Sequence, residues 1–426
     1  MNTALYGNAV VGQSGGPTAA INATLAGVIR GAMAHPEIKH IYGAVNGVEG
    51  LLKEQLALLD VQFEDEDSFT LLSQTPAAAL GSCRKKLKSP KDAPEVYEKL
   101  FEVFRKFDIR YFFYIGGNDS MDTVAKLSEY AASVQYDIRV MGVPKTIDND
   151  VAGTDHTPGF GSAAKYVAVS VQEILRDCAV YTVPAVTIVE IMGRDAGWLT
   201  SAASLPRRYC GIAPDYIYLP ERVFSYEAFY RDVKAALARH PNVVIAVSEG
   251  LRLEDGSYVG ESGQSGEADV FGHKYLAGTA KVLALAVREK FGCKVRSVEL
   301  NILQRCASHM ASMTDISESL RVGASAVDCA VGGGTAKMMR FVRLSDKPYT
   351  AEISPVDIRV SANSMRCVPD AFISPDGNDV TEACIDYLLP LCEGEGANVY
   401  RHGLPVHFVI DKTPALPDNA GTETNG

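Results

Sequence analysis

Apolar, β-branched runs alternate with helix-like stretches along most of this chain. Five runs predict buried strands: NAVVG (8–12), IRYFFYIGG (109–117), IRVMGV (138–143), AVTIVEIMG (185–193) and NVVIAVSEG (242–250). Five stretches with helical spacing predict helices: 18–34, 122–133, 162–178, 225–240 and 274–292. Strands and helices that alternate in this way are typical of parallel, doubly wound layers, so we predict an α/β fold.

Small polar residues follow each of these five predicted strands. In chain order the clusters read GQSGGP, GGNDS, PKTIDND, MGRD and SEG. In open α/β sheets, ligands bind beyond the carboxyl ends of the strands. Convergent polar loops at such an edge predict a ligand site.

Length, composition and charge narrow the class of protein. The chain has 426 residues, of which 47% are hydrophobic and 22% are charged, which indicates a globular protein of two or three domains. The net charge of −11 argues against nucleic-acid binding. Nine cysteines without CxxC spacing favour a reduced, cytoplasmic protein. We expect no signal peptide and no membrane span, because no apolar run reaches ~18 residues.

Two segments are predicted to lack regular structure. The stretch 253–272 is rich in Gly, Ser and acidic residues, which predicts a mobile loop. The polar tail 413–426 contains Pro and Gly and is predicted to be disordered.

The stretch PKTIDND (144–150) places several candidate catalytic and metal-binding residues close together. Pro144 has no N–H and is expected to end its strand, which leaves Lys145, Asp148 and Asp150 in a loop. A carboxylate there could accept a proton from a hydroxyl, and a pair could hold a divalent metal. The lysine could stabilise charge on a transferred phosphoryl group. A turn with solvated acids is the alternative.

Two Gly-rich turns open into predicted helices. The turn in GQSGGPTAAINA (12–23) suits a phosphate at a helix N-terminus, and a plain tight turn is equally compatible. In GGNDS, Asn118, Asp119 and Ser120 could bind a metal-bound phosphate or cap the helix that follows. No Walker A motif occurs. The G-x-G-x-x-G fingerprint of dinucleotide-binding proteins is also absent from the sequence, which argues against a dehydrogenase.

The later clusters suit a sugar phosphate. A carboxylate can bind hydroxyls and a guanidinium can bind phosphate. The residues concerned are Glu190, Met192, Arg194 and Glu249. Arg296 and Arg305 could bind phosphate as bidentate donors, and Arg84 is a further candidate in the basic run RKKLK. The alternatives are strand-end ion pairs and ordinary surface arginines.

Taken together, PKTIDND, MGRDAGW and GGNDS resemble the phosphofructokinase family, in the right order across nearly the whole chain. The resemblance implies two doubly wound α/β domains with the active site in the cleft between them. We therefore predict a phosphoryl-donor domain from 1–158 and 305–355. The sugar-phosphate domain is predicted from 159–304 and 356–412.

The resemblance also implies a role for each motif residue. Asp148 matches the catalytic base, Asp150 its supporting carboxylate, and Thr146 and Lys145 flank the transferred phosphoryl group. The donor-phosphate site is implied at Gly15, Gly16, Arg84, Gly117, Asp119, Ser120 and Lys145. The substrate site is implied at Thr146, Asp148, Met192, Gly193, Arg194, Glu249, Arg296 and Arg305. A Mg²⁺ ion is implied at Asn118, Asp119 and Asp150.

Two positions bear on the phosphoryl donor. ATP-using members of the family usually carry PGTIDND and GGDGS, whereas pyrophosphate-using members carry PKTIDND and GGDDS. This chain has Lys145 and Asp119, which add a cation for a small, highly charged donor and bulk where a nucleotide would lie. Asn118 departs from the family aspartate and offers a weaker, neutral metal ligand. We therefore predict pyrophosphate as the donor and fructose 6-phosphate as the acceptor, in a reversible reaction.

Alternative functions are ranked below this prediction. They are the same reaction with ATP, a wider acceptor range that includes sedoheptulose 7-phosphate, and a non-catalytic sugar-phosphate-binding subunit. Because the family shares its sugar site between subunits, we expect a homodimer or homotetramer.

Overall fold

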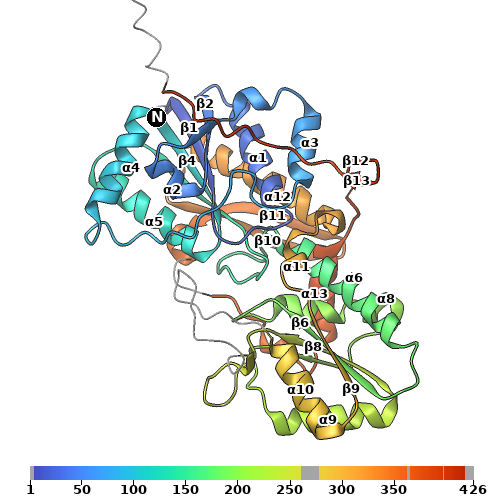
Figure 1. Ribbon diagram of the computed structural model, residues 1–426. Coiled ribbons are helices and arrows are strands. Elements are labelled where there is room, and N and C mark those ends of the chain that lie inside the picture. Colours follow the sequence, from blue (N-terminus) through green and yellow to red (C-terminus); the bar gives the residue numbers. More distant parts are fainter. Residues whose placement is uncertain (1–3, 261–277, 362–364, 397, 418–426) are drawn as a thin grey trace, which may run out of the picture.

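The computed structural model describes residues 4–260, 278–361, 365–396 and 398–417. They form two α/β domains, and Figure 1 shows segments from both ends of the chain side by side in the first of them. Within these residues, no helix is both long enough and apolar enough to cross a membrane.

The first domain is built on a seven-stranded sheet with the order β11-β10-β5-β4-β1-β2-β3. Its strands are β1 (Gly7–Gln13), β2 (Ile38–Ala44), β3 (Leu56–Leu58), β4 (Ile109–Gly116), β5 (Arg139–Pro144), β10 (Lys337–Asp346) and β11 (Tyr349–Asp357). The strands from β2 to β10 in this order pair in parallel, and the edge strands β3 and β11 pair antiparallel.

Helices cover both faces of this sheet, which explains why its central strands are apolar throughout. On one face lie α1 (Ile21–Met33), α3 (Glu66–Gln74) and α12 (Met313–Val331). On the other lie α2 (Gly47–Leu52), α4 (Pro94–Lys106) and α5 (Asn118–Ser133). Along β4, Phe113 packs toward the first set and Phe112 toward the second. α1 and α12 cross closely at Gly27, where an added Cβ would lie only 2.1 Å from the Leu320 carbonyl oxygen.

The second domain is built on a parallel four-stranded sheet with the order β7-β8-β6-β9. Its strands are β6 (Ala185–Ile191), β7 (Tyr216–Tyr218), β8 (Asn242–Ser248) and β9 (Lys294–Glu299). One face is covered by α6 (Phe160–Cys178), α7 (Trp198–Ser201) and α13 (Glu382–Leu388), and the other by α9 (Tyr226–Arg239) and α10 (Thr279–Phe291). The predicted α/β class, with both faces of each sheet covered, is confirmed.

The predicted elements all occur, with shifted ends. All five predicted strands are present, and α5 begins at Asn118, four residues before the predicted start at 122. The helix predicted over 274–292 begins at Thr279 among the described residues. Most of the loop predicted over 253–272 lies outside the described residues.

The predicted domain borders are wrong near the C-terminus. β11 runs to Asp357 in the first domain, and the buried Ile358 packs there too. Further on, the Phe408 ring stacks on Phe63 of the first domain, with ring centroids 4.8 Å apart. Figure 1 shows this C-terminal segment running across the first domain. The chain thus returns to the first domain, because apolar side chains there bury against its helices and sheet.

The start of the tail also differs from the prediction. Ala415 donates its backbone N–H to the Leu56 carbonyl at 2.7 Å and Pro414 pairs with Ala57, so these two residues of the tail lie against β3. The rest of the segment predicted to be disordered, 418–426, lies outside the described residues.

Candidate active site

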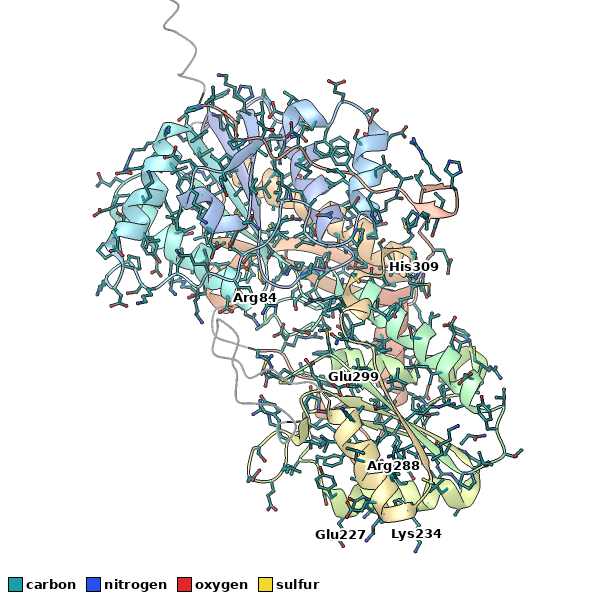
Figure 2. The ribbon with its side chains drawn as sticks, viewed as in Figure 1. Arg84, Glu227, Lys234, Arg288, Glu299 and His309 are labelled. Atoms are coloured by element: carbon teal, nitrogen blue, oxygen red, sulfur yellow. The ribbon has the colours of Figure 1, made fainter. Side chains whose placement is uncertain are left out.

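A cavity of about 470 Å³ lies between the two domains, where the carboxyl ends of both sheets face each other. Figure 2 labels Arg84, at the edge of the first domain that faces the second. Fifteen of the predicted site residues line this cavity: Gly15, Gly16, Arg84, Gly117, Asn118, Asp119, Ser120, Lys145, Thr146, Asp148, Asp150, Met192, Arg194, Glu249 and Arg305. The cavity therefore gathers loops from five strand ends, as the sequence pattern predicted.

The turn after β1 is shaped to present backbone to a ligand. Gly15 has φ +76°, a left-handed conformation that favours glycine. Its N–H donates to the Cys83 carbonyl at 3.1 Å, and its own carbonyl accepts a bond from the Ser82 hydroxyl at 2.6 Å. These bonds tie the turn to the segment that carries Arg84.

Lys145 is the most unusual residue of the cavity, because it is a lysine that is only 2% exposed. Its Nζ donates to the Gly16 carbonyl at 2.6 Å. Burial lowers the pKa of Lys145 to about 8; Asp148 opposes this, while Arg305 and Arg84 add to it. Burial and Arg84 also lower the pKa of Arg305.

Lys145 and Arg305 converge on the Gly15–Gly16 turn, and Arg84 lines the same cavity. A Cβ on Gly16 would lie 3.5 Å from Arg305 Nη1, and one on Gly15 would lie 3.4 Å from Lys145 Nζ. Like charges this close in a buried setting repel each other. An anion bound at the turn would relieve that repulsion, so the arrangement suits a highly charged phosphate.

Among the described residues, five carboxylates line the cavity, and the pKa values of three of them, Asp148, Asp150 and Glu249, are raised. Burial raises the pKa of Asp148 above its usual range, against the influence of Lys145 and Arg194. Burial and the neighbouring Asp148 raise the pKa of Asp150 to about 7, and burial also raises the pKa of Glu249 to about 7. Carboxylates perturbed in this way are typical of functional sites.

The start of α5 brings an amide and a carboxylate to the cavity. Asn118 Nδ2 donates to Asp150 Oδ2 at 3.1 Å, while Asn118 Oδ1 is buried and has no hydrogen-bond partner among the described residues. Asp119 forms an ion pair with Lys86 at 3.0 Å. The capping alternative is wrong, because Gly117 is the N-cap of α5 and no side chain bonds to the cap.

The oxygen atoms of Asn118 and Asp150 fit the requirements of a divalent cation. Oxygen ligands are what Mg²⁺ requires, and it usually retains waters beside one or two carboxylates. The unpartnered Asn118 Oδ1 and the adjacent Asp150 carboxylate fit that requirement. No group of three or more His, Cys, Asp or Glu side chains with metal-binding geometry occurs in the described parts of the chain.

The loops after β6 and β8 line the same cavity as the PKTIDND segment (144–150), here called the reactive loop. Gly193, with φ +132°, donates its N–H to Glu249 Oε1 at 3.2 Å, so it flanks the cavity and orients that carboxylate. Arg194 Nε is buried without a hydrogen-bond partner among the described residues. An unsatisfied buried guanidinium N–H beside a cavity suits an oxygen-rich ligand.

Glu190 and Arg296 are candidates that are not among the described residues lining the cavity: Glu190 Oε2 accepts the Ala280 N–H at 2.8 Å, and Arg296 lies farther along the sheet. Arg296 projects from β9, where Nη1 contacts Asp177 Oδ2 at 3.3 Å and the guanidinium lies 5.6 Å from the Tyr181 ring centroid. Its role in the sugar site stays a prediction.

Some residues near the site could not be found from the sequence. Gln304 Oε1 accepts the Met192 N–H at 3.2 Å and so holds the start of the MGRD loop. Arg366 donates its backbone N–H to the Asp150 carbonyl at 2.8 Å. No local signal marks either residue, because both contacts join distant parts of the chain.

The fold and this site define the class of protein. The family model described as Phosphofructokinase matches residues 8–330, so the chain belongs to the phosphofructokinase family. It is 44% identical over 407 residues to a pyrophosphate–fructose 6-phosphate 1-phosphotransferase of Xanthomonas campestris pv. campestris, covering 95% of this chain and 96% of the relative. It is 43% identical over 406 residues to a protein of the same name from Methylococcus capsulatus, with 95% and 96% covered.

A solved structure agrees with these relatives. The pyrophosphate-dependent phosphofructokinase from Nitrosospira multiformis superposes with a TM-score of 0.86 at 37% sequence identity. The superposition covers 96% of this chain and 97% of that one. The predicted family and two-domain fold are therefore confirmed.

Proposed function

We propose that this protein transfers a phosphoryl group from pyrophosphate to the 1-hydroxyl of fructose 6-phosphate. The products are fructose 1,6-bisphosphate and phosphate, and the reaction runs in both directions. The names of the similar proteins described above support this assignment.

The burial of Lys145 at the glycine turn is the observation that supports pyrophosphate as the donor. Its Nζ lies 2.6 Å from the Gly16 carbonyl oxygen, in a cavity also lined by Arg84. A compact, highly charged donor pairs with these two cations. Asp119 at the first turn of α5 adds a negative charge and bulk on the side where a nucleotide would extend.

Asp148 is the catalytic base in this proposal. It lies in the cavity near Lys145 and Arg194, whose charges favour its ionised form against the effect of burial. The carboxylate accepts the proton of the attacking hydroxyl, while Lys145 and Thr146 lie beside the transferred phosphoryl group. Catalysis rests on positioning and charge neutralisation, because phosphoryl transfer requires little covalent chemistry from the protein.

Asn118 and Asp150 would hold Mg²⁺, with Asp119 as a further ligand. Asp119 is the more constrained candidate, because its Oδ1 is ion-paired with Lys86 at 3.0 Å. When bound, Mg²⁺ neutralises the charge on the phosphate oxygens. Asn118 leaves one carboxylate fewer at the metal than an aspartate would, which predicts weaker metal binding.

The sugar phosphate contacts the loops after β6 and β8. Arg194 and Arg305 pair with its phosphate, and Glu249 and Met192 contact the sugar. Arg296 contributes from a second subunit, so the active protein is a homodimer or homotetramer. We place it in the cytoplasm, consistent with nine cysteines that are all free thiols in the described residues.

Three alternatives remain open to test. ATP could replace pyrophosphate, sedoheptulose 7-phosphate could replace fructose 6-phosphate, or the chain could bind sugar phosphate without catalysis. The joint presence of Asp148 and Arg194 in one cavity argues against the non-catalytic alternative.

Initial rates with a single donor test the proposal. Purified protein is assayed with Mg²⁺ and fructose 6-phosphate, and either pyrophosphate or ATP is supplied. We expect turnover with pyrophosphate alone. Turnover with ATP alone would refute the donor assignment, and turnover with neither would favour the non-catalytic alternative.

A further inference from the structure

Residues 154–159, here called the cradle, form hydrogen bonds with the reactive loop. Thr157 donates its hydroxyl to the Thr146 carbonyl at 2.8 Å and its N–H to Asn149 Oδ1 at 3.1 Å. The Thr146 N–H in turn donates to the Pro158 carbonyl at 3.2 Å. The position of the loop backbone therefore depends on where the cradle lies.

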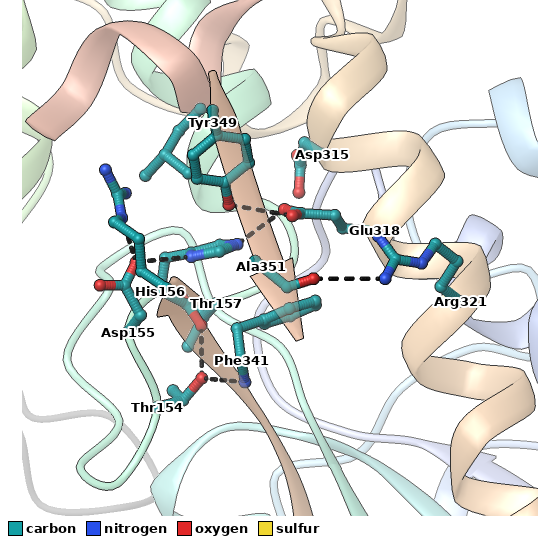
Figure 3. Close-up of polar contacts among 12 residues, drawn as sticks. Thr154, Asp155, His156, Thr157, Asp315, Glu318, Arg321, Phe341, Tyr349 and Ala351 are labelled. Carbon is teal, nitrogen blue, oxygen red and sulfur yellow. Dashed lines mark hydrogen bonds and ion pairs between the residues drawn. The ribbon is translucent and has the colours of Figure 1, made fainter. Parts of the chain in front are cut away.

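His156 anchors the middle of the cradle, as Figure 3 shows. The side chain is buried, with Nδ1 2.9 Å from Asp155 Oδ2 and Nε2 2.7 Å from Glu318 Oε2. Its ring stacks on Phe341 with centroids 4.5 Å apart. Ionised carboxylates only accept hydrogen bonds, and both ring nitrogens donate only in the imidazolium form. This geometry therefore suits a positively charged His156.

Every element packed around His156 contributes a charged or titratable group. Helix α12 contributes Glu318 and Asp315. Strand β11 contributes Tyr349, which donates to Glu318 Oε1 at 2.9 Å. Strand β10 contributes Arg343, which donates to Asp155 Oδ2 at 3.1 Å. Burial lowers the pKa of His156, but its bonds to Asp155 and Glu318 raise it more, so the net shift is upward.

The same cluster reaches the second domain. The Asp155 carbonyl accepts the Tyr387 hydroxyl at 2.8 Å, and that hydroxyl accepts Asn149 Nδ2 at 3.3 Å. Tyr387 belongs to α13 of the second domain. Glu318 belongs to α12, which packs on α1, the helix after the glycine turn. The contacts of Asp155, His156 and Glu318 thus link the reactive loop to α12, which packs on α1, and to the second domain.

We propose that His156 is a positioning residue for phosphoryl transfer, whose imidazolium is clamped between Asp155 and Glu318 and thereby fixes the cradle and the reactive loop. This inference rests on the proposed function. His156 is not among the described residues that line the cavity, so it acts through the loop and not by contact with substrate.

Replacement of His156 by glutamine tests the positioning role. Small displacements of reacting groups can cost up to about 100-fold in rate, so His156→Gln is expected to lower kcat at least about tenfold. KM for both substrates is expected to change less than about threefold, because no substrate contact is lost. Rates are compared below the melting temperature of both proteins. A lower melting temperature with unchanged kcat would show a merely structural role and overturn the proposal.

His35→Gln is the matched control. His35 also contacts carboxylates, with Nε2 2.8 Å from Asp328 Oδ1 and Nδ1 3.9 Å from Glu37 Oε2, but it is not among the described residues that line the cavity. Its replacement is expected to leave kcat unchanged. An equal loss of kcat in both variants would overturn the specific role of His156.

Nitrogen-15 NMR of the histidine rings gives a test that needs no turnover. Near neutral pH we expect a ring signal with both nitrogens protonated that is present in the wild type and disappears in His156→Gln. Glu318→Gln removes the negative charge of one acceptor, so that signal is expected to lose its proton at lower pH than in the wild type. A His156 signal with a single proton, or no shift in Glu318→Gln, would overturn the clamp.

These readouts separate the two proposals. A wild type that turns over neither pyrophosphate nor ATP would refute the proposed function, and the positioning role would fall with it. The NMR result would still decide whether the charged clamp exists.

Discussion

Lys145→Met is expected to abolish turnover with pyrophosphate and to remove a pH-dependent destabilisation of the unliganded protein. Lys145 is 2% exposed, and burial lowers its pKa to about 8. In the unfolded chain its pKa returns to ~10.4. The unfolded state therefore binds this proton more tightly, so the native state is destabilised below about pH 8, and the penalty shrinks as pH rises toward ~10.4.

The size of this destabilisation follows from the difference in the Lys145 pKa between the folded and unfolded states. The penalty is about 3 kcal/mol near pH 7.5 and about 1 kcal/mol near pH 9.5. The wild type should therefore gain about 2 kcal/mol in unfolding free energy, relative to Lys145→Met, over this interval. The lost hydrogen bond to the Gly16 carbonyl shifts the variant's stability at every pH, and so it leaves this difference intact.

Urea unfolding followed by circular dichroism measures the difference at the two pH values. Lys234→Met is the matched control, because Lys234 is an exposed lysine on α9 (Figure 2). Its pH response should parallel that of the wild type. If Lys145→Met also parallels the wild type, Lys145 titrates as an ordinary surface lysine and the electrostatic argument for the donor site fails.

Four further predictions concern the reaction. Asp148→Asn should lower kcat by orders of magnitude with little change in sugar affinity, and a surviving rate would exclude Asp148 as the base. Asp119→Gly combined with Lys145→Gly should raise the ATP-to-pyrophosphate rate ratio, and an unchanged ratio would place the block to ATP elsewhere. Asn118→Asp adds a carboxylate beside Asp150 and should lower the Mg²⁺ concentration for half-maximal rate; no change in a Mg²⁺ titration would argue against a metal there. Because burial and Asp148 raise the pKa of Asp150 to about 7, kcat/KM should fall as pH drops below about 7, and a flat profile down to about pH 5 would contradict this shift.

Much of the fold follows from local sequence. The central strands β4, β5, β6 and β8 are apolar on both faces because helices cover both, so their runs stand out along the chain. Two of the strands missed by the sequence analysis, β3 and β9, are shorter or more exposed than these. β9 alternates exposed and half-buried residues, and β3 has three residues. Their pattern does not differ enough from that of loops.

Some features of the site likewise follow from local sequence, and others depend on tertiary packing. By itself, the sequence determined the α/β layers, the polar clusters at strand ends and the motifs that mark a phosphofructokinase, because strand periodicity and loop chemistry are local properties. Only the tertiary structure decided that Lys145 is buried, that Arg366 holds the Asp150 backbone, and that His156 meets a carboxylate 162 positions away. It also decided that the C-terminal segment returns to the first domain. Such contacts depend on how distant elements pack, and sequence spacing carries no record of that packing.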